Sequence, residues 1–127
     1  MARVRKGKAA KGIRRAADEA RLDELIEEAI VDCYNESEQI TGFLTMLEEH
    51  LALPFSTIIL GTEVTVERID ITDDEVIVAT CRRGRDRQWI SVLDLPLPRP
   101  RPVGSEWIDA YRKWSRWSQR NDQYAEE

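Results

Sequence analysis

Four side chains with oxygen ligands lie close together in the stretch 32–38: Asp32, Asn35, Glu36 and Glu38. Calcium takes about six to eight oxygen ligands, from carboxylates, amides, backbone carbonyls and water, in a flexible geometry. The spacing allows some of these side chains to converge on one ion, so the stretch is a candidate calcium site. A run of acids is also typical of a solvated helix face with capping residues. The residue types alone leave both interpretations open.

Other chemistries have less support in the sequence. His50 is the single histidine and has no acidic or thiol partner in a catalytic motif. The chain contains no nucleophile elbow, glycine-rich phosphate loop or HExxH helix, so we expect no enzymatic activity. Cys33 and Cys81 lack CxxC spacing, and with one histidine they do not make a zinc site. We expect both cysteines to be reduced and to behave as small buried hydrophobic residues.

The sequence also lacks an EF-hand loop. The segment that starts at Asp70 begins with a suitable spacing of acids, but its sixth position is Glu75 and its twelfth is Cys81. An EF-hand needs glycine at the sixth position for a sharp turn and a bidentate glutamate at the twelfth. Any calcium site in this chain is therefore expected to be of a non-EF-hand kind.

The candidate ligands fall at the junction of two predicted helices. Apolar residues recur at helical spacing in both helices: Leu22, Leu25, Ile26, Ala29, Ile30, Cys33 and Tyr34 in the first, and Ile40, Phe43, Leu44, Leu47 and Leu51 in the second. Asn35 or Ser37 can cap the second helix, and Pro54 must end it. Asp32 lies near the C-terminal end of the first helix, where the dipole disfavours a carboxylate, so it needs a compensating cation or donor. Gly42 indicates a closely packed neighbour in this helical hairpin.

After the second helix the apolar period shifts to two and β-branched residues become frequent. The predicted strands are STIILG, TEVTVERIDI, EVIVATCRR and QWISVLDL, joined by turns at ITDDE and RRGRDR. A meander of this size favours a small SH3-like or Sm-like antiparallel sheet or half-barrel. PLPRPRP predicts an extended strap, and Trp107, Tyr111 and Trp114 then lie at helical spacing, with Ser105 as a cap. The predicted fold class is α+β: an N-terminal helical hairpin, this sheet and a C-terminal aromatic helix.

Charge is segregated along the 127 residues. Residues 1–15 carry seven bases and no acid, residues 16–75 carry a net charge of −15, and residues 76–127 carry +3. We expect a basic disordered arm at 1–17 and a single domain at 18–127. No apolar run reaches the roughly 18 residues that span a bilayer, and no hydrophobic signal core is present. We therefore expect a cytoplasmic protein with no membrane partner.

The run IVDCYNESEQITGFLTMLEEHLALPF, at 30–55, resembles the signature of the cyanobacterial-type small calcium-binding protein family, which is also called CcbP-like. Family members have an IVDAY-like helix end, an acidic elbow, a helix that ends in LED or LEE, and a following xPF. The resemblance covers roughly 22–117 and implies a bacterial protein that binds calcium, as a buffer or a sensor. Carried over residue by residue, it implies a calcium site at Asp32, Glu36, Glu38, Glu48 and Glu49.

The basic residues raise a second class of function. Arg82, Arg83, Arg85 and Arg87 lie in one predicted hairpin, and with the basic arm they could lie along phosphates, as in a nucleic-acid or ribosome-associated adaptor. The acidic helices argue against this function, as does the lack of exposed stacking aromatics in the arm and the hairpin. The same arginines could instead neutralise acids that would otherwise hold metal. Which protein partner reads the state of the domain stays open.

Overall fold

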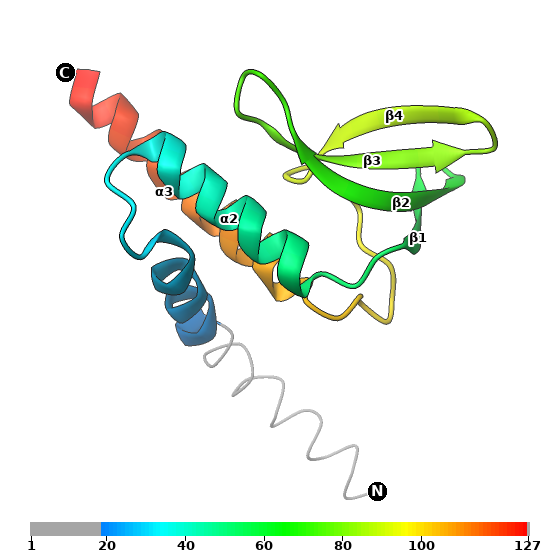
Figure 1. Ribbon diagram of the computed structural model, residues 1–127, viewed down its shortest axis with the longest axis horizontal. Coiled ribbons are helices and arrows are strands. Elements are labelled where there is room, and N and C mark those ends of the chain that lie inside the picture. The colour runs from blue at the N-terminus through cyan, green and yellow to red at the C-terminus, as the bar shows by residue number, and fades with distance from the viewer. Residues whose placement is uncertain (1–18, 127) are drawn as a thin grey trace, which may run out of the picture.

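The computed structural model describes residues 19–126, with side chains through Gln119, so the predicted basic arm lies outside the described residues. A first helix occupies 19–30 and leads through a short elbow to α2. A sheet follows, and a long helix is the last of the described elements (Figure 1). The bounds are α2 Glu36–His50, β1 Phe55–Ile59, β2 Thr62–Ile71, β3 Ile77–Arg83, β4 Asp86–Ser91 and α3 Glu106–Glu126. The predicted α+β class and the order of its elements are confirmed.

The first helix and α2 form the predicted hairpin. A Cβ atom added at Gly42 would lie 2.1 Å from the carbonyl oxygen of Ala29, so the two helix backbones touch at this point. The predicted close neighbour of Gly42 is therefore the first helix. The apolar stripe of the first helix is shorter than expected, because Tyr34 lies beyond the helix and is 88% exposed.

The sheet is an antiparallel meander in the order β1-β2-β3-β4. Its register pairs Phe55 with Val66 and Thr80 with Trp89, and a bulge interrupts β2 between Val66 and Arg68. Both predicted turns join strands at the expected places. Within the described residues β1 and β4 are the two edges and do not pair with each other, so the sheet is open and the SH3-like or Sm-like detail is not confirmed.

The core lies where α2, α3 and the inner face of the sheet meet. Phe43 is fully buried and packs against two rings of α3, with centroid distances of 5.5 Å to Tyr111 and 5.3 Å to Trp114. Aromatic pairs at these distances prefer edge-on or offset arrangements and add stability beyond the area they bury. The predicted C-terminal aromatic helix thus docks on the helical hairpin, although Trp117 stays 59% exposed.

The segment between β4 and α3 carries no regular secondary structure through the prolines, as the sequence predicts. Arg112 fixes its start, because Nε donates to the carbonyl oxygen of Val92 at 3.0 Å and Nη2 donates to that of Leu95 at 2.5 Å. Its end packs on the end of α2, where the amide of Ala52 donates to the carbonyl oxygen of Val103 at 2.8 Å. None of the described helices has the length and apolar character to cross a membrane.

Candidate metal centre

The elbow between the first helix and α2 has a defined backbone. The amide of Cys33 donates to the carbonyl oxygen of Ile30 at 3.0 Å and closes the last turn of the first helix. Asp32 lies beyond that turn with a φ of 62°, in the left-handed region that aspartate tolerates better than most side chains. Asp32 thus lies just after the end of the first helix, whereas the sequence analysis placed it inside the helix, near its C-terminal end. Cys33 is a half-buried free thiol and Cys81 a buried one.

Two of the predicted ligands form a reciprocal helix cap. Oδ1 of Asn35 accepts the amide of Glu38 at 2.8 Å, and Oε1 of Glu38 accepts the amide of Tyr34 at 2.6 Å. This arrangement resembles a capping box and satisfies two backbone donors that the start of a helix leaves free. The predicted capping role of Asn35 is confirmed. One oxygen of Asn35 and one of Glu38 are therefore already engaged, and the second carboxylate oxygen of Glu38 is not used by the cap.

Asp32 and Glu36 supply the less engaged carboxylates. Both side chains are exposed, and no lysine, arginine or histidine among the described residues forms an ion pair with either. Glu36 lies in the first turn of α2, where the helix dipole favours a negative charge. Burial raises the pKa of the Tyr111 hydroxyl, and the nearby Glu36 charge raises it further. Glu36 is thus close to α3 as well as to the elbow.

A further acid reaches the start of α2 from the sheet. The hydroxyl of Ser37 donates to Oε1 of Glu75, which lies in the turn between β2 and β3. Glu75 has a φ of 64°, and the exposed Asp73 and Asp74 precede it in the same turn. The sequence analysis recognised this hairpin turn but did not bring it to the elbow. No local pattern could do so, because the contact joins residues 38 positions apart.

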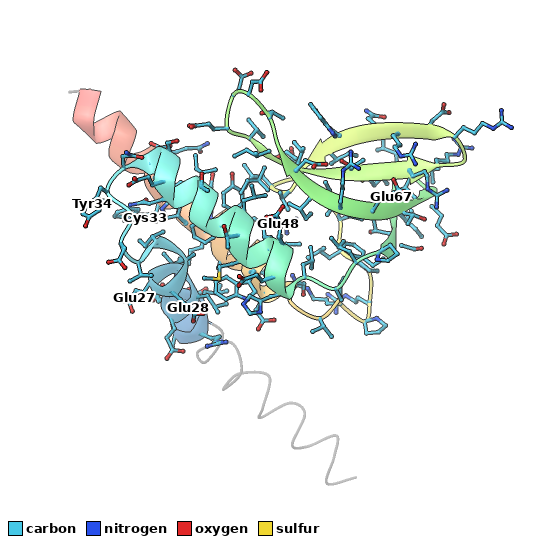
Figure 2. All side chains as sticks on the ribbon, viewed as in Figure 1. Glu27, Glu28, Cys33, Tyr34, Glu48 and Glu67 are labelled. Carbon is cyan, nitrogen blue, oxygen red and sulfur yellow. The ribbon has the colours of Figure 1, made fainter. Side chains whose placement is uncertain are left out.

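Glu48 and Glu49 lie at the other end of α2 from the elbow. Glu48 follows Glu36 by twelve positions, which is about 18 Å along a helix axis at roughly 1.5 Å per residue. Figure 2 shows Glu48 well separated from the elbow residues Cys33 and Tyr34. Bonds from calcium to oxygen are about 2.4 Å long, so one ion does not contact both ends of the helix. The structure therefore divides the six predicted ligands into two places.

The donor atoms fit calcium in chemistry but are not assembled. Every candidate at the elbow offers oxygen, which hard cations prefer. In the part of the chain that the structure describes, no three acidic, histidine or cysteine side chains lie close enough together to hold a metal ion. The carboxylates at the elbow are exposed and can rotate about their side-chain bonds. A site there forms only if the ion draws these side chains together.

The arginines of the second hairpin bind acids of the sheet. Glu67 accepts Nε of Arg82 at 2.7 Å and Nε of Arg87 at 2.9 Å (labelled Glu67 in Figure 2). Hydrogen bonds from Arg87 and then Arg82 lower the pKa of the Glu67 carboxyl. On the same face, Arg68 Nε lies 2.8 Å from Asp70. Neutralisation of acids by these arginines, which the sequence allowed, thus occurs at Glu67.

One exposed aromatic residue escaped the sequence analysis. Trp89 on β4 is 57% exposed and lines, with Arg68, Thr80, Arg87 and Gln88, a shallow pocket of about 210 Å³. The expectation that no exposed aromatic accompanies the basic hairpin is wrong for the strand that follows the turn. The two-residue period predicted this strand but did not show which face is left uncovered.

Comparisons with known proteins identify a family that the chain matches. The CcbP family model, described as calcium binding, matches residues 23–115. The matched segment contains the elbow, all four strands and the first part of α3. No curated protein and no solved structure matches the chain.

Proposed function

Because the chain belongs to the CcbP family of calcium-binding proteins, we propose that it binds calcium at the elbow between the first helix and α2. Asp32 and Glu36 are the main carboxylates of this site, and Asn35 and Glu38 contribute oxygens while they hold the cap. Glu75 joins from the turn between β2 and β3, since it already contacts Ser37 at the start of α2. The observation that carries the proposal is that Asp32 and Glu36 are exposed carboxylates with no described basic partner. Glu38 and Glu75, by contrast, each already accept a described hydrogen bond.

The role of the ion follows from the charges. Carboxylates that lie close together repel one another, and an ion that neutralises them stabilises the folded chain. Calcium, when bound, supplies positive charge beside Asp32, which lies after the negative end of the first helix dipole. The chain's own residues fix the backbone around that position through the Asn35 cap. Binding should therefore make the angle between the first helix and α2 less variable.

The exposure of the ligands favours a weak calcium site over a high-affinity buffer or sensor. Calcium affinity rises with the number of charged ligands and with the rigidity of the site. Here the carboxylates are exposed and must be gathered by the ion, which costs conformational entropy. We expect a dissociation constant on the order of 10⁻⁴ to 10⁻³ M, as in weak calcium modules. Magnesium should bind more weakly, because it demands a near-octahedral shell and gives up water reluctantly.

Titration calorimetry and thermal melts in buffer stripped of metal test the proposal. Calcium at about 100 times its dissociation constant should stabilise a site specific to the folded state by roughly 2.7 kcal/mol. For a domain of this size, this corresponds to a rise in Tm on the order of 10 °C. The variant D32N/E36Q should lose most of this rise, and its calcium-free form should be more stable than the calcium-free parent.

The matched control is E48Q/E49Q, which removes two charges from the same chain at the other end of α2. This variant should keep the calcium-dependent rise in Tm. An equal loss in both variants would mean that calcium acts through overall charge and not through the elbow. If calcium at about 100 times the expected dissociation constant gives neither binding heat nor a rise in Tm, calcium binding itself is contradicted.

A second candidate function rests on Trp89. Its exposed indole lies beside Arg68 and Arg87, and a base that stacks on an aromatic ring while guanidinium groups meet phosphate is a common mode of single-strand binding. Filter binding of single-stranded nucleic acid at low and physiological salt tests this function. W89A should weaken binding, whereas W117A, which removes a comparably exposed tryptophan from α3, should not. Removal of residues 1–15 would show what the basic segment adds.

A further inference from the structure

A groove of about 510 Å³ lies between the first helix and the middle of α3. Ile26 and Ile30 form one apolar wall, and Trp114 and Trp117 form the other. The first helix therefore has two apolar faces. Leu25 and Ala29 are buried in the core, whereas Ile26 and Ile30 are only partly covered and face the groove. The apolar surface of this helix is wider than the core of the chain requires.

The rim of the groove is acidic along the first helix. Asp23 and Glu27 line it from that side and Lys113 from α3. Lys113 Nζ is engaged by two acids, at 2.7 Å from Glu19 and 2.8 Å from Asp23. Glu27 is exposed and has no ion-pair partner in the part of the chain that the structure describes. Lys113, the one base among the described residues that line the groove, is thus already neutralised, and these residues keep a net negative charge.

We propose that this groove binds a basic amphipathic helix of another protein. The partner helix places two large apolar side chains, one turn apart, between the isoleucines and the tryptophans. Its lysines or arginines lie against Glu27 and Asp23. This interaction surface is independent of the calcium site, and it assigns a chemistry to the protein partner.

The shape of the groove favours a helix over other ligands. Asp23, Ile26, Glu27 and Ile30 follow the spacing of one helix face, and Trp114 and Trp117 do the same on α3. Two helices with facing apolar rows accept a third helix between them, in the way that amphipathic helices lie in apolar grooves of other proteins. Every described residue that lines the groove belongs to a helix and none to a sheet edge, so strand addition does not apply to this lining. The acidic rim disfavours nucleic acid and anionic lipid, since both carry negative phosphates.

Charge complementarity should set the specificity of this surface. An apolar groove alone binds any apolar helix of suitable size, whereas opposite charges on the rim select the basic one and repel the acidic one. The attraction acts between exposed charges and should weaken as salt rises. Tryptophan on the wall supplies the large contact area that dominates binding at protein interfaces.

Calorimetry with the full chain in chelator-treated buffer tests the proposal separately from calcium binding. The probe is a synthetic 18-residue helix with leucine on one face and lysine elsewhere. Two comparison peptides carry glutamate in place of lysine, or the same composition in scrambled order. We expect micromolar binding of the first peptide and at least about tenfold weaker binding of the other two. Equal binding of the acidic peptide would overturn the proposal.

Two pairs of variants place the binding in the groove. E27K should weaken binding about tenfold or more, whereas E28K, which changes the next exposed residue outside the groove, should change it less than about twofold. Figure 2 labels both residues on the first helix. W117A should weaken binding in the same way, and W89A, on the distant sheet, should not. Equal effects within either pair would mean unspecific attraction and would overturn the proposal.

Two further outcomes would assign the groove to another occupant and would likewise overturn the proposal. Concentration-dependent dimerisation in sedimentation runs that W117A abolishes would identify a second copy of the chain. Reversal of Lys11, Arg14 and Arg15 to glutamate tests the chain's own basic N-terminal segment. If this change strengthened binding of the lysine peptide, that segment would be the occupant, because its release from the groove would remove a competitor for the same acidic rim.

Discussion

At the scale of single residues, the contact between Gly42 and Ala29 decides how closely the first helix can approach α2. A Cβ at position 42 would meet the carbonyl oxygen of Ala29 at 2.1 Å, which is backbone and cannot turn aside. The glycine lowers helix propensity by up to about 1 kcal/mol relative to alanine. Its presence therefore reflects packing and not local helix preference.

G42A should destabilise the protein by about 1 to 3 kcal/mol, because the collision outweighs the gain in helix propensity. Urea denaturation followed by circular dichroism measures the change. T45A, at an exposed position of the same helix, is the control and should change the free energy of unfolding by less than about 0.5 kcal/mol. A neutral or stabilising G42A would mean that the first helix does not pack where we describe it.

Glu67 gives the sheet a pH dependence whose sign follows from its partners. Hydrogen bonds from Arg87 and Arg82 hold its pKa in the folded state below the ordinary value of 4.5. Its contribution to stability is thus present above pH 4.5 and is lost as the pH falls through the folded-state pKa. E67Q should be less stable than the parent at neutral pH, and the two stability curves should converge in acid.

Urea midpoints between about pH 7 and pH 3 measure both curves. E63Q is the matched control, because Glu63 is exposed on the same strand and has no described arginine partner. Its curve should parallel that of the parent throughout. Parallel curves for E67Q as well would contradict a role for the arginine pair.

At the scale of elements, the reciprocal cap at the elbow connects local structure to the proposed site. Asn35 accepts the amide of Glu38, and removal of such a cap costs about 1 kcal/mol. N35A should therefore destabilise the protein by that amount and weaken calcium binding, since the cap holds the elbow backbone. N35D keeps the capping oxygen and adds a charge, so it should bind calcium more tightly than the parent. Chemical denaturation and calorimetry check the two variants, and weaker calcium binding by N35D would contradict the placement of the site.

The same elements show how far the sequence predicts this fold. Both helices of the hairpin, all four strands and the cap at Asn35 follow from periodicity and local chemistry, which act over a few residues. The approach of Glu75 to Ser37 and the exposure of Trp89 do not, because each depends on how separate elements pack. The open edge of the sheet likewise depends on strand curvature, which a two-residue period does not encode. The family signature located the elbow but assigned Glu48 and Glu49 to the same site. These two residues lie at the far end of α2, a helix of fifteen residues, from the elbow.

At the scale of the whole molecule, acidic charge is concentrated in the helical hairpin and the start of the sheet. Residues 16–75 carry a net charge of −15. Part of this charge is paired, as in the contacts of Lys113 and of the arginine hairpin. The unpaired remainder destabilises the compact state through repulsion that salt can screen.

An increase in sodium chloride from about 0.05 to 0.5 M should raise the Tm of the calcium-free protein by a few degrees, because screening relieves this repulsion. The calcium-loaded protein should gain less, since the ion already neutralises the elbow. Scanning calorimetry at each salt concentration measures the difference between the two forms. A calcium-free Tm that falls with salt would mean that attractive ion pairs outweigh repulsion in this chain.

The junction between the end of α2 and the start of α3 limits how relatives of this chain can diverge. Gly104 has a φ of 87°, and a Cβ there would lie 2.1 Å from the carbonyl oxygen of His50. Asparagine can replace a glycine that is needed only for its backbone angle, but here it would collide. Across an alignment of the family, position 104 should therefore admit no other residue wherever the two helix ends meet as they do here. Position 84, where the added atom meets nothing, should drift freely to asparagine or aspartate. Lineages that lose the glycine at 104 should also have changed the length of the proline segment before it, because only a rerouted connection removes the collision.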